Sequence, residues 1–208
     1  MKLSYAIPVC NELVEIQHLI KFLLDNKRPE DEIVVLYDSK NGDPGVETYL
    51  RKMNVERTLF RWKPFKFNGN FSDMKNRLNG MCEGDYIFQI DADEMLNEYM
   101  IKIIPQVLEI NQGVDLMRVP RINKVEGLTE AHIQKWGWKV DEKGRVNWPD
   151  MQWRLYRNDP RIRWHGEVHE KIIGHATHAV LPIKEDFALI HNKTIERQEK
   201  QNAYYDTL

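Results

Sequence analysis

The sequence is poor in cysteine and has no long apolar run. Its two cysteines, Cys10 and Cys82, are too few for a disulfide framework or for a zinc site built on paired Cys-x-x-Cys motifs. Such low cysteine use is typical of a reducing compartment, so we expect a cytoplasmic protein. No apolar stretch approaches the roughly 20 residues that cross a bilayer, and we therefore expect no transmembrane segment.

The sequence also lacks an excess of charge of either sign. It has 30 Lys and Arg against 32 Asp and Glu, which leaves a net charge of −2. Proteins that bind nucleic acid through bulk electrostatics are strongly basic, so we expect no nucleic-acid partner. Apolar residues make up 42% of the chain, enough for a packed core.

Glycine-rich phosphate loops are absent as well. No Gly-x-Gly-x-x-Gly follows the first expected strand, and no Gly-x-x-x-x-Gly-Lys-Ser/Thr occurs anywhere. These absences argue against a Rossmann dehydrogenase and a P-loop NTPase. A nucleotide bound by this chain would instead have its phosphates held through a metal ion.

Short apolar runs alternate with helical patterns over the first 120 residues. We expect strands at residues 3–7, 32–37, 86–94 and 114–119, with another inside 55–62, and helices at 13–24, 46–53, 71–81 and 98–111. Pro8 is expected to end the first strand and Ser72 to cap the third helix. This order predicts an α/β fold with a mostly parallel central sheet flanked by helices.

The second part of the chain has a different character. Residues 121–150 are poorly periodic and hold Trp136, Trp138 and Trp148, so we expect an irregular lobe over one edge of the sheet. Strands at 151–157 and 188–191 and a polar helix at 194–208 are expected beyond it. The tryptophans either line a pocket or simply pack.

Polar side chains follow three of the expected strands. Asp91 and Asp93 end the apolar run 86–90, and strand alternation puts both on one face, with Glu94 pointing away from Asp93. Two converging carboxylates repel unless a cation such as Mg²⁺ or Mn²⁺ lies between them. Asn11-Glu12 and Asp38 follow the first two strands at the same edge, where open α/β sheets bind ligands. The alternative is a solvated acidic turn without function.

A cluster of histidines and glutamates lies in the last third of the chain. His165, His169 and His191 fit metal ligation, acid–base catalysis or ordinary structural roles, and the roles of the first two are left open. Glu170 is the better candidate for a general base, since a carboxylate can accept a proton from a hydroxyl nucleophile.

Several motifs, in this order and spacing, resemble the GT-A-type glycosyltransferases of family 2. Within that family the likeness is to the branch of the lipopolysaccharide-core glycosyltransferases and the SunS-like enzymes. The similar segments are Cys10-Asn11-Glu12, the strand ending in Asp38-Ser39, Phe71-Ser72-Asp73-Met74-Lys75-Asn76, Asp91-Ala92-Asp93-Glu94, Arg154-Leu155-Tyr156-Arg157 and Gly166-Glu167-Val168-His169-Glu170. Lys75 stands where the family has arginine.

The resemblance implies one GT-A domain over residues 1–208, with a nucleotide-binding half at 1–120 and an acceptor-side half at 121–208. It implies a metal-dependent, inverting transfer of a sugar from a nucleotide sugar, a UDP-sugar in the first place, to a glycan, lipid-linked or protein acceptor. The implied roles are Mn²⁺ or Mg²⁺ binding by Asp91, Asp93 and His191, donor binding by Pro8, Asn11, Glu12, Asp38, Lys75 and Asp91, and base catalysis by Glu170.

Two other functions remain open at this stage. A sugar nucleotidyltransferase on a similar sheet would need a glycine-rich basic loop near the N-terminus, which residues 8–12 do not form. A catalytically inactive carbohydrate-binding module would have no need to keep Asp91, Asp93, Glu170 and His191 together. The sequence predicts neither the donor sugar, nor the acceptor, nor the oligomeric state.

Overall fold

The computed structural model describes residues 1–56, 59–167 and 170–205. Its helices are α1 (Leu13–Asn26), α2 (Pro44–Glu56), α3 (Phe71–Asn79), α4 (Glu98–Ile110), α5 (Glu130–Trp136) and α6 (Ile195–Tyr205), with a short 3-10 helix at Glu185–Phe187. Its strands are β1 (Leu3–Val9), β2 (Glu32–Asp38), β3 (Phe60–Phe65), β4 (Tyr86–Gln89), β5 (Glu94–Met95), β6 (Leu116–Glu126), β7 (Val146–Arg157), β8 (Arg163–His165), β9 (Lys171–Ile173), β10 (His178–Val180) and β11 (Leu189–Thr194).

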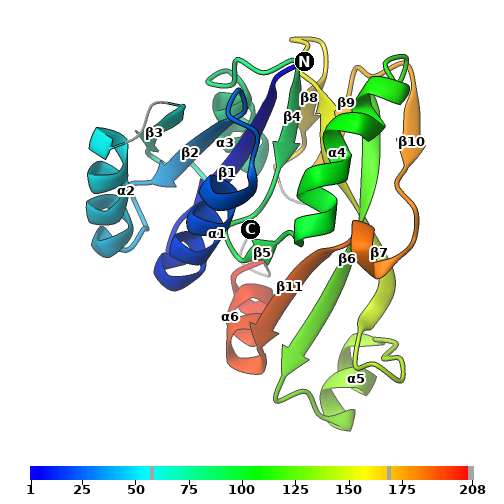
Figure 1. Ribbon diagram of the computed structural model, residues 1–208. Coiled ribbons are helices and arrows are strands. Elements are labelled where there is room, and N and C mark those ends of the chain that lie inside the picture. The colour runs from blue at the N-terminus through cyan, green and yellow to red at the C-terminus, as the bar shows by residue number, and fades with distance from the viewer. Residues whose placement is uncertain (57–58, 168–169, 206–208) are drawn as a thin grey trace.

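One large sheet organises the described residues (Figure 1). Its strand order is β3-β2-β1-β4-β7-β6-β11-β5, with β10 paired to β6. The pairs among β3, β2, β1 and β4 are parallel, as are those that β11 and β10 make with β6. Within this sheet, antiparallel pairing is confined to β7 with β4 and β6, and to β5 with β11. The predicted α/β fold with a mostly parallel central sheet flanked by helices is therefore confirmed.

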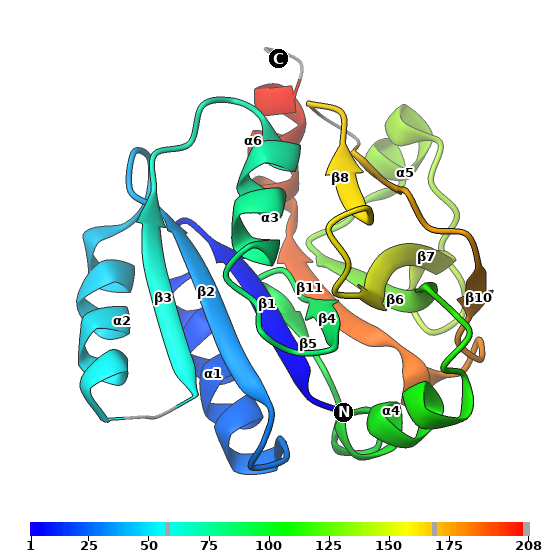
Figure 2. The same cartoon turned by 90° about the horizontal axis from the view of Figure 1, so that it is seen from above.

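Helices lie on both faces of the sheet (Figure 2), and strand alternation sends apolar side chains toward each face. On one face, Tyr5 and Ile7 of β1 pack in a cluster with apolar side chains of α1, α2 and α4. On the other face, Ala6 belongs to a second cluster that includes Met74 and Leu78 of α3 and reaches the β8–β9 hairpin. Because both faces are covered, β2 is buried over its whole length. In the described part of the chain, no helix combines the length and apolar character that crossing a membrane requires.

The prediction that Pro8 ends the first strand is wrong. β1 continues to Val9, and Pro8 stays in register with Leu36 of β2. On its other side, the pairing of β1 with β4 extends only from Leu3 to Ala6. Beyond Ala6 the strand has a neighbour on one side, so proline's missing N–H costs no ladder hydrogen bond there. Pro8 is thereby carried to the edge of the sheet where the ligand site was expected.

Helix α3 is capped by Asn70, not by Ser72 as predicted. The Asn70 side chain accepts a hydrogen bond from the Asp73 backbone N–H at 3.0 Å. Ser72 is buried within the first turn, and its hydroxyl donates to the Gly166 carbonyl. This bond ties α3, which carries Lys75, to the segment that leads to Glu170.

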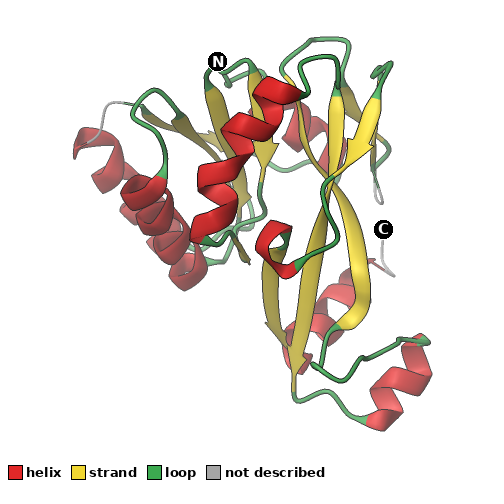
Figure 3. Ribbon diagram, turned by 45° about the vertical axis from the view of Figure 1, so that its right-hand side comes forward, coloured by secondary structure: helices red, strands yellow, loops and turns green. Residues whose placement is uncertain are grey.

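Residues 121–150 are more regular than predicted. β6 runs on to Glu126, β7 begins at Val146, and the two strands form a long ribbon with α5 at its tip (Figure 3). The periodic signal is weak because Arg121 and Asn123 of β6 form polar contacts inside the sheet with Asp150 of β7. β6 also crosses residue 120, where the two functional halves were predicted to meet, and that division stays a prediction.

Candidate active site

A large cleft of about 1210 Å³ opens where β1 and β2 end and β6, β7 and β11 approach them. Nine side chains that the sequence singled out lie along it: Pro8, Asn11, Glu12, Asp38, Lys75, Asp91, Asp93, Glu170 and His191. They come from strand ends, from α3 and from the last strand, so only the fold brings them together. His165 lies exposed on β8 and is not part of the cleft lining, and His169 falls outside the described residues.

The β1–β2 end of the cleft is held by short-range hydrogen bonds. Asp38 is buried and accepts from the Lys40 backbone N–H at 2.9 Å and from the Asn41 side chain at 2.9 Å. Glu12 accepts from the Cys10 backbone N–H at 2.8 Å with one oxygen, which orders the loop after β1. Burial, and then the nearby Asp38 and Glu12, raise the pKa of the Cys10 thiol to about 12, so this cysteine is protonated and not nucleophilic near neutral pH.

A chain of polar contacts orients the Asp93–His191 pair. Asn123 donates from its amide nitrogen to Asp150 at 2.8 Å, which turns its carbonyl oxygen toward His191. His191 Nδ1 lies 2.8 Å from that oxygen and therefore donates to it. His191 Nε2 then faces Asp93 Oδ2 at 3.2 Å, so a proton or another cation must lie between the ring nitrogen and the carboxylate.

This arrangement fits a divalent cation. An imidazole that donates one ring N–H to an oxygen and directs the other nitrogen at a carboxylate is the usual arrangement around a metal-bound histidine. Within the described ranges, however, no group of three His, Cys, Asp or Glu residues is placed to hold a metal. Asp93 and His191 offer two ligands, and any others would have to come from a bound ligand or from water.

Asp91 is directed elsewhere. Its carboxylate forms an ion pair with Arg154, which is 3% exposed and also donates to Glu94 at 2.6 Å. Burial alone would raise the pKa of Asp91, but Arg154, and then Lys75, outweigh it and lower that pKa. Asp91 therefore stays ionised at the cleft wall without facing His191.

Glu94 stabilises this part of the site through buried hydrogen bonds and ion pairs. It is buried, accepts from Arg121 at 2.9 Å as well as from Arg154, and accepts from the Asp91 backbone N–H at 3.0 Å with its second oxygen. Glu94 thus holds the Asp91–Asp93 turn in shape, a role the sequence left open. Arg154 was visible only as part of a family-like motif, and its charge-pairing role was not predicted.

Arg197 is a site residue that the sequence reasoning missed. It lies in the first turn of α6 and donates to Glu12 at 2.9 Å and to Glu15 at 2.8 Å, with Asp93 at 3.4 Å. Burial would raise the pKa of Asp93, but the hydrogen bond and charge of His191, followed by Arg197 and Lys193, hold it well below its usual range. The sequence indicated only a polar helix after the last strand, and such a pattern does not show which of its charged side chains face the cleft.

Glu170 forms an ion pair with Lys75 of α3. The Lys75 ammonium also lies 4.2 Å from the centre of the Trp164 ring. A carboxylate and an ammonium thus share one wall of the cleft, opposite in charge and both within reach of a ligand bound there.

The family model described as Glycosyl transferase family 2 matches residues 4–171. The structure is similar to that of S. aureus TarS 1-349 in complex with UDP-GlcNAc, with a TM-score of 0.64 and 18% identity over 93% of this chain and 59% of that one. It is also similar to S. aureus TarS 1-349 in complex with UDP, with a TM-score of 0.63 and 18% identity over 94% of this chain and 61% of that one.

The chain spans about three fifths of those TarS fragments. It also matches a longer S. aureus TarS structure with a TM-score of 0.63 and 16% identity, over 97% of this chain and 38% of that one. At such identities the likeness shows the fold alone. A search of curated protein sequences finds no match.

Proposed function

Because the chain belongs to glycosyl transferase family 2, we propose that it transfers a sugar from a nucleotide-sugar donor, a UDP-sugar in the first place, to an acceptor hydroxyl. The observation that carries this proposal is the gathering, in one cleft, of a carboxylate–imidazole pair at Asp93 and His191 and a separate carboxylate at Glu170. The TarS structures with UDP-GlcNAc and UDP support the same class of donor.

The donor would lie along the β1–β2 end of the cleft. Pro8, Asn11, Glu12 and Asp38 line the part available to the nucleoside, and Asp38 already has its carboxylate fixed by its own turn. Lys75 supplies positive charge for the diphosphate. Asp91, which Arg154 holds by an ion pair, would serve the ribose or reach the metal through water.

A Mn²⁺ or Mg²⁺ ion would be held by Asp93 and His191, and Asp91 would reach it through water. When bound, such an ion neutralises the charge that develops on the leaving diphosphate. Asn123 fixes the His191 ring so that Nε2 faces the ligand side, which removes a rotational freedom that binding would otherwise have to restrict.

Glu170 would act as the general base. It accepts the proton of the acceptor hydroxyl as that oxygen bonds to the anomeric carbon and the bond from this carbon to the diphosphate breaks. Attack from the face opposite the leaving group inverts the anomeric configuration. In the structure Glu170 is paired with Lys75, so donor binding has to draw that ammonium toward the diphosphate before the carboxylate is available.

The acceptor class and the branch within the family are further proposals. A glycan, lipid-linked or protein acceptor and a cytoplasmic location follow from the sequence resemblance and the low cysteine use.

A thermal-shift experiment tests the donor and metal roles together. UDP with Mn²⁺ should raise the melting temperature of the wild type more than UDP alone, and Asp93→Asn should lose that metal-dependent part. Asp186→Asn, an exposed carboxylate outside the cleft, is the matched control. Hydrolysis of UDP-sugars is then screened with the same variants. An equal metal-dependent rise in Asp93→Asn and the wild type would refute the metal role, and no response to any nucleotide sugar would refute the function.

A further inference from the structure

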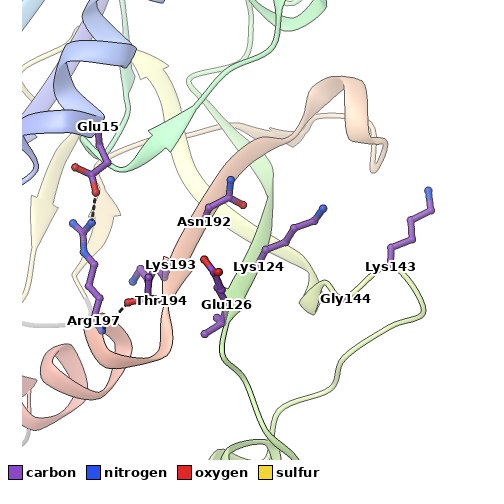
Figure 4. A pocket seen from close by; sticks show the side chains of 10 residues that line it. Glu15, Lys124, Glu126, Lys143, Gly144, Asn192, Lys193, Thr194 and Arg197 are labelled. Carbon is purple, nitrogen blue, oxygen red and sulfur yellow. Dashed lines mark hydrogen bonds and ion pairs between the residues drawn. The ribbon is translucent and has the colours of Figure 1, made fainter.

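A second pocket of about 590 Å³ lies beside the main cleft (Figure 4). Its walls come from the ends of β6 and β11, the start of α6, the loop before β7 and the start of α1. Lys124, Val125, Lys193 and Arg197 line both this pocket and the cleft, so the two spaces are contiguous. We call it the basic pocket.

The basic pocket has the opposite charge to the chain as a whole. Its lining holds four cations, Lys124, Lys143, Lys193 and Arg197, against two carboxylates, Glu15 and Glu126. The whole chain carries a net charge of −2. A positive concavity on a net-negative chain concentrates anions at that place.

The cations of the basic pocket differ in the carboxylates with which they pair. Arg197 donates to Glu15 at 2.8 Å, which uses the charge of that carboxylate within the pocket (Figure 4). Lys143 lies 2.6 Å from Glu185, a carboxylate that it shares with Arg145. The Lys124 ammonium is exposed and forms no hydrogen bond or ion pair with any residue that the structure describes, and its charge acts on Glu185 at longer range. Positive charge therefore remains available in the pocket after the internal pairs have formed.

We propose that the basic pocket binds a phosphate group carried by the acceptor substrate. Lysine ammonium groups bind phosphate as point charges, and lysines from separate segments suit a group that carries more than one negative charge. The pocket has a volume usual for small-molecule sites. This inference rests on the proposed function, because it takes the cleft to hold a sugar acceptor beside the basic pocket.

The probe is sn-glycerol 1-phosphate, compared with glycerol. The protein is first saturated with UDP and Mg²⁺, so that the phosphate cannot bind in the donor site, and binding is then followed by NMR chemical-shift titration. Glycerol phosphate should bind and shift backbone signals of β11 and the loop before β7, and glycerol should not. Lys143→Glu should weaken this binding about fivefold, the effect of reversing one partly solvated charge.

Two further variants sharpen the test. Glu126→Gln removes a carboxylate from the lining and should tighten glycerol phosphate binding. Lys52→Glu makes the same charge reversal as Lys143→Glu on the exposed side of α2, and should bind like the wild type. Equal affinity of Lys143→Glu and Lys52→Glu, or equal binding of glycerol and its phosphate, would overturn the proposal.

The affinity for UDP, measured on the same samples, separates this inference from the proposed function. Lys143 lines the basic pocket and not the cleft, so its substitution should leave UDP affinity unchanged. Normal UDP binding without phosphate binding would refute the basic pocket alone. Failure of the wild type to bind UDP would refute the proposed function instead.

Discussion

Lys75 and Glu170 form an ion pair in the wall of the cleft, 95 positions apart in the chain. Their side chains are 12% and 11% exposed, so the pair is largely shielded from water. Each partner has a separate role in the proposed reaction, one toward the diphosphate and one toward the acceptor. Substituting them one at a time therefore distinguishes the two roles.

Glu170→Gln should strongly reduce the rate of transfer and leave donor binding intact. Glutamine keeps the size of the side chain but cannot accept the acceptor's proton, and loss of a general base costs about 10²- to 10⁴-fold in kcat. The measurement is sugar transfer at saturating donor, with UDP affinity determined in parallel. Glu167→Gln, an exposed neighbour in the same segment, is the control and should retain activity. Equal loss of transfer and of UDP binding in Glu170→Gln would indicate a structural role.

Lys75→Met should weaken UDP binding about tenfold. Methionine retains much of the aliphatic length but removes the charge proposed to meet the diphosphate, and a lost charge-assisted contact is worth roughly 1.5 kcal/mol. Calorimetric titration with UDP and, separately, with uridine is the test. Affinity for uridine should not change, because the nucleoside does not reach Lys75. A fall in kcat with unchanged UDP affinity would mean that Lys75 serves Glu170 only.

Arg154→Met should destabilise the fold by about 3 kcal/mol or more, because it leaves Asp91 and the buried Glu94 short of a counter-charge. The free energy of unfolding is measured by urea denaturation. The double variant Arg154→Met with Glu94→Met should recover part of the loss, since the buried charge is then removed as well. Arg161→Met breaks an ion pair of Asp159 with an arginine that is 83% exposed, and should cost less than about 1 kcal/mol.

Asp150→Asn should change how stability depends on pH. Burial alone would raise the pKa of Asp150, but Arg121 and Asn123 outweigh it and lower that pKa from its usual 3.8. A carboxyl with a depressed pKa in the folded state stabilises the protein above its unfolded-state pKa, and this contribution is lost as the pH falls through the folded-state pKa.

The wild type should therefore melt above Asp150→Asn at about pH 6, and the gap should shrink as the pH is lowered toward about 2. Melting curves of both proteins over this range give the measurement. A gap that stays constant with pH would show that Asp150 acts through packing and not through its charge.

The sequence allowed the α/β fold to be predicted, and the gathering of polar strand ends along one cleft, because both depend on local patterns. Buried strands such as β2 are continuous apolar runs, and polar residues directly after such strands lie at one edge of a parallel sheet. Asp38 and Asp91 were assigned to that edge in this way, and both line the cleft; their roles stay predictions. The same reasoning failed for β6, whose polar side chains are satisfied by Asp150 of a strand more than twenty residues later.

The charge network of the site was not predictable for a related reason. Arg154 meets Asp91 across 63 positions, and Arg197 meets Glu12 across 185. Neither separation produces a periodic signal, and an arginine in a strand or in a polar helix has many possible partners. Motif similarity located some of these residues, and only the three-dimensional arrangement assigned their partners.

The contacts of Arg154 also constrain which amino-acid substitutions this protein can accumulate. A lineage that lost Arg154 first would pass through a form in which the buried Glu94 keeps only Arg121 of its two arginine partners. A lineage that lost Glu94 first would leave Arg154 paired with Asp91 alone. Drift at these two positions should therefore proceed as joint replacement and not one residue at a time. In proteins that descend from this one, Arg154 and Glu94 should be kept together or replaced together, whatever change occurs in the sugar or the acceptor.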